Sequence, residues 1–163
     1  YVSVLFCSVF LGFRSGRPAA RYHTGSKFII MSATKVFICA AKRTPFGAFG
    51  GSLKAHSPTT LAVHAAKAAL AAGNVDPAIV DTVCVGNVQQ TGADTIYLSR
   101  HVGIQAGVPI ETPALTINRL CGSGFQAITT VAQDIMLGNA SVGLAAGAEC
   151  MSQVCFCNAE AGN

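Results

Sequence analysis

The stretch ALTINRLCGSGFQAITTVAQDIMLG, from Ala114 to Gly138, contains a strand, a turn and a helix. Ala114 to Asn118 predicts a short strand, and the chain then turns between Arg119 and Gly124. Helical spacing predicts a helix ending at Gly138, with an apolar face made by Phe125, Ile128, Val131, Ala132 and Ile135. A further apolar run, Ser141 to Ala148, predicts the next strand. A helix that connects two such strands indicates parallel pairing.

A similar unit begins near the middle of the first hundred residues. Val36 to Ala41 predicts a buried strand, because it is a continuous apolar run. A loop from Lys42 leads to Ser57 and Pro58, which suit the N-cap and first position of a helix that Gly73 stops. The apolar face expected for that helix contains Leu61, Ala65, Ala68, Ala69 and Ala72.

A second unit of the same kind lies between these two. Val83 to Val88 predicts a strand, and Asp94 to Ala106 predicts a helix that Gly107 closes. Strands therefore alternate with helices along the chain. The predicted fold class is α/β, with a mostly parallel sheet.

Composition narrows the possible functions. Of 163 residues, 51% are hydrophobic and 11% are charged, against about 25% charged in ordinary soluble domains. This excludes disorder and a coiled coil, and it indicates that some of the surface meets further protein. The net charge is +4, but Lys42-Arg43 is the only adjacent basic pair, which argues against nucleic-acid binding. Seven cysteines at irregular spacing indicate free thiols in a reducing compartment.

Residues 1–30 differ from the rest and are predicted to form a basic leader. They contain arginines, a lysine and serines but no acidic residue. The first acidic residue of the chain is Asp76. This pattern is typical of a mitochondrial transit peptide; the alternative is translated upstream sequence, with Met31 as the start. The apolar stretch Tyr1 to Leu11 is shorter than the roughly 20 residues that span a bilayer, so no membrane span is expected.

The turn at Cys121 is the most chemically distinctive part of the chain. A thiol at the start of a helix is stabilised as a thiolate. Gly122 and Gly124 allow backbone N–H groups to approach a reacting carbonyl. Cys121 is therefore a candidate nucleophile, and the alternative is a cysteine that packs as a small apolar side chain.

The same turn also fits a dinucleotide-binding fingerprint. Gly122-x-Gly124-x-x-Ala127 follows a strand, and Glu149 lies near the end of the next strand, as a ribose-binding acid would. That fingerprint normally follows the first strand of its fold, whereas two units precede it here. A dinucleotide-binding domain is thus the weaker alternative.

Two motifs carry a family resemblance. Lys42-Arg43-Thr44-Pro45-Phe46-Gly47 and Asn118-Arg119-Leu120-Cys121-Gly122-Ser123-Gly124-Phe125-Gln126 resemble the thiolase family, and the resemblance extends from about Lys35 to Gln153. It implies that Cys121 is the acylated cysteine of an acyltransferase that cleaves 3-ketoacyl-CoA with CoA as co-substrate, with no permanently bound cofactor and no metal. Phe125-Gln126 resembles the fatty-acid β-oxidation branch, which implies the mitochondrial matrix.

The resemblance also implies that the chain is incomplete. The family's catalytic His, its second Cys, its oxyanion Asn and its CoA-gripping loop all lie beyond the equivalent of Gln153. Residues 31–153 are therefore expected to form a partial N-terminal thiolase domain, followed by a divergent tail over 154–163. The full-length protein is expected to be a homo-oligomer, and this fragment alone inactive. The alternative is a catalytically silent fragment that pairs with a full-length relative.

The remaining candidate residues are assigned no role. The histidines do not match the family's catalytic motif: His23, His56, His64 and His101. The spacing of Cys150, Cys155 and Cys157 matches no common zinc site.

Overall fold

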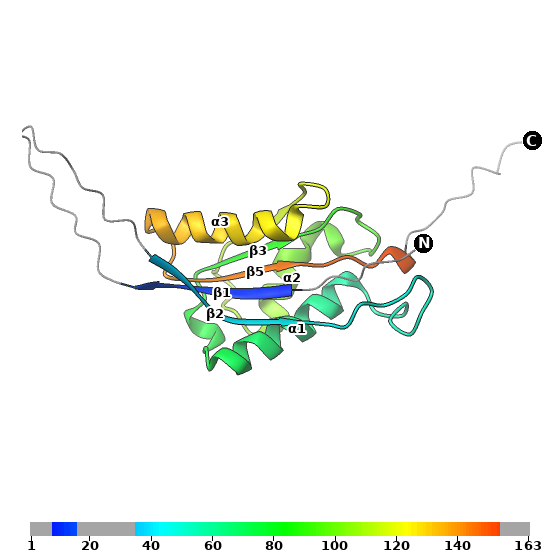
Figure 1. Cartoon of the computed structure of the whole chain (residues 1–163), viewed down its shortest axis with the longest axis horizontal. Helices are drawn as coiled ribbons and strands as arrows, with labels where there is room; N and C mark the ends of the chain where they lie inside the picture. Colours follow the sequence, from blue (N-terminus) through cyan, green and yellow to red (C-terminus); the bar gives the residue numbers. More distant parts are fainter. Residues whose placement is uncertain (1–7, 16–34, 154–163) are drawn as a thin grey trace, which may run out of the picture.

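A computed structural model of the chain describes residues 8–15 and 35–153. Its strands are β1 (Ser8–Ser15), β2 (Lys35–Arg43), β3 (Thr82–Gly86), β4 (Ala114–Ile117) and β5 (Val142–Gly147). Its helices are α1 (Pro58–Gly73), α2 (Leu98–Ala106) and α3 (Ser123–Leu137), with short 3-10 turns at Pro77–Ile79, Thr95–Tyr97 and Met151–Gln153. One sheet lies between α3 on one face and α1 with α2 on the other (Figure 1). The α/β prediction is confirmed. The predictions for the rest of the leader and for the tail fall outside the described residues.

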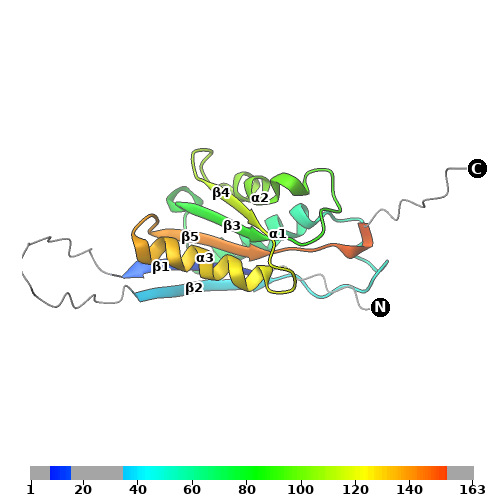
Figure 2. The same ribbon diagram turned by 90° about the horizontal axis from the view of Figure 1, so that it is seen from above.

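The sheet has the strand order β2-β1-β5-β3-β4. β3 is parallel to both β4 and β5, as the alternating strands and helices predicted. β1 is antiparallel to both of its neighbours and joins β2 to β5 (Figure 2). Ser8 therefore lies opposite both Arg43 and Gly147. The sequence analysis did not predict β1, because its partners are chosen by contacts distant in sequence rather than by local pattern.

Helix α1 begins as predicted and ends at Gly73. The Ser57 hydroxyl accepts a hydrogen bond from the Thr60 N–H at 3.1 Å, and Pro58 is the first helical residue. Gly73 is the last helical residue rather than the residue that caps the helix. Asn74 closes it in the left-handed conformation, with φ of 49°, a conformation that asparagine adopts more readily than most residues.

The buried face of α1 differs in part from the prediction. Leu61, Ala65 and Ala69 are buried as expected, but Ala68 and Ala72 are exposed. The other buried apolar positions are Ala62, Val63, Ala66 and Leu70. The face that packs on the sheet is thus wider than one row of alanines, because α1 contacts β2 and β1 on one side and α2 on the other.

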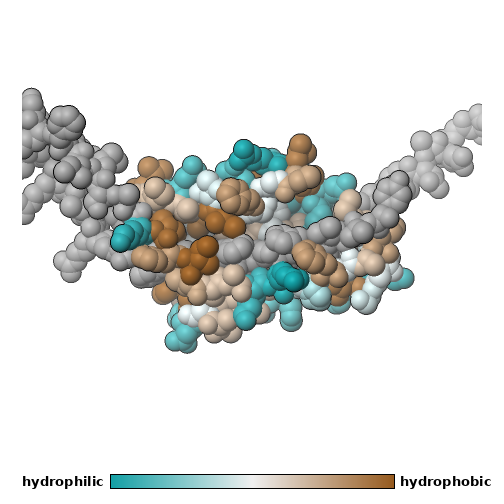
Figure 3. All heavy atoms as spheres, viewed as in Figure 1, coloured by the Kyte–Doolittle hydropathy of each residue, from teal (hydrophilic) through white to brown (hydrophobic). Residues whose placement is uncertain are grey.

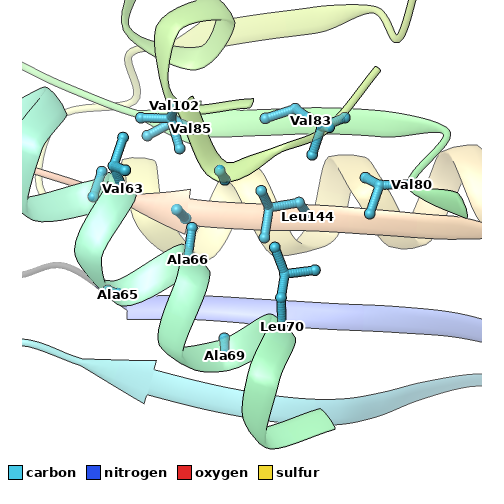
Figure 4. Close-up of a cluster of buried hydrophobic side chains, with 14 of the residues drawn as sticks. Val63, Ala65, Ala66, Ala69, Leu70, Val80, Val83, Val85, Val102 and Leu144 are labelled. Atoms are coloured by element: carbon cyan, nitrogen blue, oxygen red, sulfur yellow. The ribbon is translucent and has the colours of Figure 1, made fainter. Parts of the chain in front are cut away.

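The two central strands divide the core between the two layers of helices. Val83, Val85 and Leu144 pack with α1 and α2 (Figure 4). The residues that alternate with them, Cys84 and Ala145, pack instead with α3. This alternation is the period of two expected of strands buried on both faces.

The outer strands are more exposed than predicted. The run Val36 to Ala41 was expected to be buried, yet Phe37 is 47% and Ile38 is 60% exposed. β2 pairs on one side only, with β1. Phe125, expected on the apolar face of α3, is 73% exposed, and Ala127 is buried instead. Apolar side chains gather on the visible surface between α3 and α1 (Figure 3). Within the described ranges, no helix combines the length and apolar character that crossing a membrane requires.

Candidate active site

The candidate site lies where β3, β4 and β5 end and α3 begins. Two glycines allow α3 to approach the strand ends closely. A Cβ atom on Gly86 would lie 2.5 Å from the carbonyl carbon of Ser123, and one on Gly147 would lie 2.9 Å from the Cα of Gly124. Both distances are far shorter than real Cβ contacts. The first turn of α3 is therefore seated directly on the carboxyl edge of the sheet, where α/β proteins commonly bind ligands.

Cys121 lies on the turn that leads into this helix. It is exposed, and it immediately precedes Gly122, the N-cap of α3. Leu120 before it has φ of 48°, the left-handed conformation that a leucine rarely adopts. The predicted placement of a thiol at the start of a helix is thus present in the structure, on a turn with unusual backbone geometry.

Ser123 ties this turn together. Its Oγ accepts a hydrogen bond from the Arg119 N–H at 2.8 Å and donates one to the Leu120 carbonyl at 2.6 Å. The Ser123 N–H also donates to the Leu120 carbonyl, at 3.0 Å. Ser123 is only 4% exposed, so these bonds are shielded from competition with water.

Asn118 connects the turn to a neighbouring loop. Its Oδ1 accepts from the Leu120 N–H at 2.9 Å, and its Nδ2 donates to the Val88 carbonyl at 3.3 Å. The Val88 N–H in turn donates to the Glu149 carboxylate at 3.0 Å. A continuous set of hydrogen bonds thus joins the ends of three strands to the residue before Cys121.

Glu149 is the charged member of this set. Burial raises the pKa of its carboxyl above the ordinary value of 4.5, and hydrogen bonds from Val88, Gln89 and Asn87 oppose that rise. Both carboxylate oxygens accept bonds from these groups at 3.0 to 3.3 Å. The carboxylate is therefore occupied by protein groups rather than placed to receive a ribose. β4, which would carry the dinucleotide fingerprint, is moreover an outer strand, so the structure gives that alternative no support.

The other described thiols differ from Cys121. Burial first, and the charge of Asp134 second, raise the pKa of the Cys84 thiol to about 12. Cys150 is also buried, whereas Cys39 is exposed on β2. Only Cys39 and Cys121, among the four cysteines in the described ranges, are open to a reagent in solution.

The described histidines lie apart from the thiol. His101 Nδ1 is 3.2 Å from Asp94 Oδ2, and its ring contacts Tyr97. His56 and His64 are exposed, and none of these three is hydrogen-bonded to Cys121. Residues 8–15 and 35–153 also contain no group of three metal-ligating side chains. A cavity of about 250 Å³ exists near Asp81 and Asp134, but Cys121 does not line it.

The sequence analysis identified Cys121 but not the residues that hold its turn. Asn118 and Ser123 were quoted only as part of the motif. An Asn whose side chain can accept from the backbone N–H two residues later is nevertheless a recognisable turn signal. The left-handed conformation of Leu120 has no signal in the sequence, because leucine is not a residue that favours it.

The fold and the site together define an α/β domain that presents an exposed cysteine on the turn between a sheet and a helix. The chain belongs to the thiolase family, since residues 36–162 match the family described as Thiolase, N-terminal domain. The resemblance inferred from the motifs is confirmed.

Relatives agree with this assignment. The chain is 59% identical over 122 residues to mitochondrial 3-ketoacyl-CoA thiolases from Bos taurus and Homo sapiens, covering 75% of this chain and 31% of each relative. The crystal structure of human mitochondrial 3-ketoacyl-CoA thiolase in complex with CoA superposes with a TM-score of 0.73 and 56% identity, over 78% of this chain and 33% of that one. The chain thus spans about a third of the length of these relatives.

Proposed function

We propose that Cys121 is the acyl-accepting nucleophile of a thiolase-type acyltransferase that cleaves 3-ketoacyl-CoA, with CoA as co-substrate. The observation that carries this proposal is the exposed thiol immediately before the N-cap of α3, within a chain of the thiolase family. The names of the mitochondrial 3-ketoacyl-CoA relatives support that substrate class. They also support a mitochondrial location, and we propose a role in fatty acid β-oxidation in the matrix.

The chemistry proceeds in two transfers. The Cys121 thiolate adds to the 3-keto carbon of the substrate, and the bond between C2 and C3 then breaks. Its electron pair stays on C2, which takes a proton, so acetyl-CoA leaves and the shortened acyl group remains on sulfur as a thioester. The thiolate of an incoming CoA attacks that thioester and displaces the Cys121 thiolate. Covalent catalysis of this kind divides one difficult cleavage into two easier steps.

Proton transfer in these steps needs groups that the described residues do not place beside Cys121. His101 is paired with Asp94, and Glu149 is bound by backbone N–H groups. We propose that the acid and base come from polypeptide that follows the N-terminal domain in whole thiolases. The isolated chain is then expected to show no thiolytic turnover of acetoacetyl-CoA.

Thiol alkylation tests the nucleophile directly. Limiting iodoacetamide, followed by mass spectrometry of peptides, gives the rate at each cysteine of the native chain. Cys121 is expected to react fastest of the seven. Cys39 serves as the exposed reference, and Cys84 is expected to stay unmodified because its pKa of about 12 leaves it protonated at neutral pH.

Two controls make this experiment decisive. Cys121→Ser should remove the fast phase and leave the rate at Cys39 unchanged. Denaturation should bring all seven rates together, because unfolding removes both burial and the helix N-terminus. Equal rates for Cys121 and Cys39 in the native chain would contradict the proposal.

A second candidate function rests on the exposed apolar surface. Leu115 on β4 is 50% exposed, and Ile38 on β2 is 60% exposed. Both strands are outer strands of the sheet, so their backbone edges are open to further pairing. We propose as the alternative a catalytically silent chain that persists by association with a full-length thiolase. We further propose that the full-length protein is a homo-oligomer.

Co-expression separates the two functions. The chain would be produced with a tagged full-length mitochondrial 3-ketoacyl-CoA thiolase, and the purified complex would be examined by size-exclusion chromatography with light scattering. A stable mixed complex in which Cys121→Ser has no effect on turnover supports the silent chain. A mixed complex whose turnover falls with Cys121→Ser supports the nucleophile.

A further inference from the structure

The strained residue next to the nucleophile is held by hydrogen bonds rather than by packing. Leu120 adopts φ of 48°, yet its side chain is 70% exposed. An exposed side chain makes too few contacts to hold the backbone in a conformation that leucine disfavours. The restraint must therefore act on the backbone itself.

Both polar groups of the Leu120 backbone are bound. Its N–H donates to Asn118 Oδ1 at 2.9 Å. Its carbonyl accepts from the Ser123 hydroxyl at 2.6 Å and from the Ser123 N–H at 3.0 Å. The same hydroxyl accepts from the Arg119 N–H at 2.8 Å, so one buried oxygen bonds both to the Leu120 carbonyl and to the N–H of the residue before Leu120.

Ser123 is itself fixed in place. Its backbone belongs to the first turn of α3, which contacts the strand ends, since a Cβ on Gly86 would lie 2.5 Å from the Ser123 carbonyl carbon. The hydroxyl is therefore presented from a rigid support. Asn118 completes the restraint from the other side through its bond to Val88.

We propose that Ser123 is a positioning residue for Cys121, because its hydroxyl holds Leu120 in the left-handed conformation that presents the thiol at the start of α3. This inference rests on the proposed function of Cys121. Without the hydroxyl, Leu120 relaxes to negative φ and the Cys121 thiol moves away from the helix N-terminus. A left-handed conformation costs leucine about a factor of ten in population, which sets the scale of the expected effect.

The experiment compares the alkylation rate of Cys121 with that of Cys39 in the same molecule. Ser123→Ala is expected to lower this ratio about tenfold. Glycine adopts positive φ freely, so the double variant Ser123→Ala with Leu120→Gly is expected to recover the ratio to within about twofold of the native value. If Ser123→Ala acted only by loosening the fold, Leu120→Gly would not restore the alkylation ratio.

Two further variants complete the set. Leu120→Val keeps Ser123 but places a β-branched residue at positive φ, and it is expected to lower the ratio without the loss of any hydroxyl. Thr129→Ala is the matched control. It removes a hydroxyl that bonds only to the Phe125 carbonyl within α3, and it should leave the ratio unchanged.

A second readout separates this inference from the proposed function. The ¹³C chemical shifts of residue 120 report its backbone conformation whatever the reactivity of the thiol. The shifts should indicate a left-handed residue 120 in the native chain and in Leu120→Gly. In Ser123→Ala they should move toward the values of a residue with negative φ. Native Cys121 reacting no faster than Cys39 would overturn the proposed function. Any of three results would overturn the positioning role: a native ratio in Ser123→Ala, unchanged shifts at residue 120 in that variant, or no recovery of the ratio in the double variant.

Discussion

Glu149 holds the loop after β3 in place. Its carboxylate accepts from the Val88 N–H at 3.0 Å and the Gln89 N–H at 3.1 Å, and Asn87 Nδ2 lies 3.3 Å away. The Val88 carbonyl in turn accepts a hydrogen bond from the Asn118 side-chain amide, beside the turn that carries Cys121. A half-buried acid that accepts several hydrogen bonds acts here as a structural acceptor, with consequences that can be measured.

We expect Glu149→Gln to lower the free energy of unfolding at mildly acidic pH by about 1–3 kcal/mol, because the new amide NH₂ faces a backbone N–H that has lost its acceptor. Glu111→Gln, at an exposed position, is the matched control and should change little. Urea unfolding monitored by circular dichroism provides the measurement. A Glu149→Gln variant as stable as the Glu111→Gln control would show that the three bonds contribute nothing.

The native chain and Glu149→Gln should also differ in how the free energy of unfolding depends on pH. Burial raises the folded-state pKa of Glu149 above 4.5. Its contribution to stability is therefore fully present below its unfolded pKa and is lost as the pH rises through the folded-state value. The native chain should lose stability relative to Glu149→Gln as the pH is raised from about 4 to about 7. The opposite trend would mean that the hydrogen bonds outweigh burial.

Residues differ in how well the sequence predicts them. The position of Cys121 at a helix start is predictable, because apolar spacing places the thiol between a strand and a glycine-rich helix start. The left-handed Leu120 is not predictable, since leucine favours negative φ and only the surrounding hydrogen bonds reverse that preference. The occupied carboxylate of Glu149 is likewise invisible in the sequence, where its spacing suggested a ribose ligand.

Among the elements, the seating of α3 on the strand ends depends on glycine. Gly86→Ala places a methyl group 2.5 Å from the Ser123 carbonyl carbon, which is backbone and cannot rotate away. We expect a loss of about 1–3 kcal/mol or more in unfolding free energy. A fall in the ratio of Cys121 to Cys39 alkylation should accompany it, because the helix start must shift.

Gly103→Ala is the matched control for this substitution. Its Cβ would lie 3.2 Å from Val83 Cγ2, a side-chain atom, and the residue is in the helix α2. Alanine is favoured over glycine in helices by about 1 kcal/mol, which offsets the tighter contact. Thermal unfolding and alkylation measured together distinguish the two glycines. A loss of alkylation selectivity in Gly103→Ala would point to general loosening rather than to the seat of α3.

The positions of helices and strands were predictable where the helical and strand periodicities of apolar residues differ clearly. The helices α1, α2 and α3 follow from apolar spacing and capping, and β3 and β5 follow from short apolar runs. The burial of β2 was predicted wrongly, because an apolar run such as Val36 to Ala41 gives the same pattern in a central or an outer strand. Strand order decides between the two, and strand order is a property of the whole sheet.

At the scale of the whole molecule, β1 joins parts of the sheet that otherwise do not pair. Among the strands in residues 8–15 and 35–153, β2 is hydrogen-bonded to the sheet only through β1, whose other neighbour is β5. Local pattern could not reveal this arrangement, since Ser8–Ser15 lies in a stretch whose basic residues suggested a leader. The strand also lies outside residues 36–162, which match the thiolase domain.

We expect Phe10→Pro to separate β2 from β5. Phe10 lies opposite Ala41 on one side and Ala145 on the other, and proline removes a hydrogen bond that a central strand requires. Hydrogen exchange at Val142–Gly147 should accelerate, and light scattering should show association through the opened edges. Phe10→Ala, which keeps the backbone N–H at the same position, is the control. Unchanged exchange in Phe10→Pro would show that β1 does not support β5.

The position of β1 has a consequence for biosynthesis. β1 leaves the ribosome long before β5, the strand with which one of its edges pairs, Ser8 opposite Gly147. Closing such a distant contact is slow, because the entropy of the intervening loop must be lost before any pairing is gained. During translation one edge of β1 can pair with β2 as soon as that strand is made, but the other edge must wait for β5 and is available to chaperones until then.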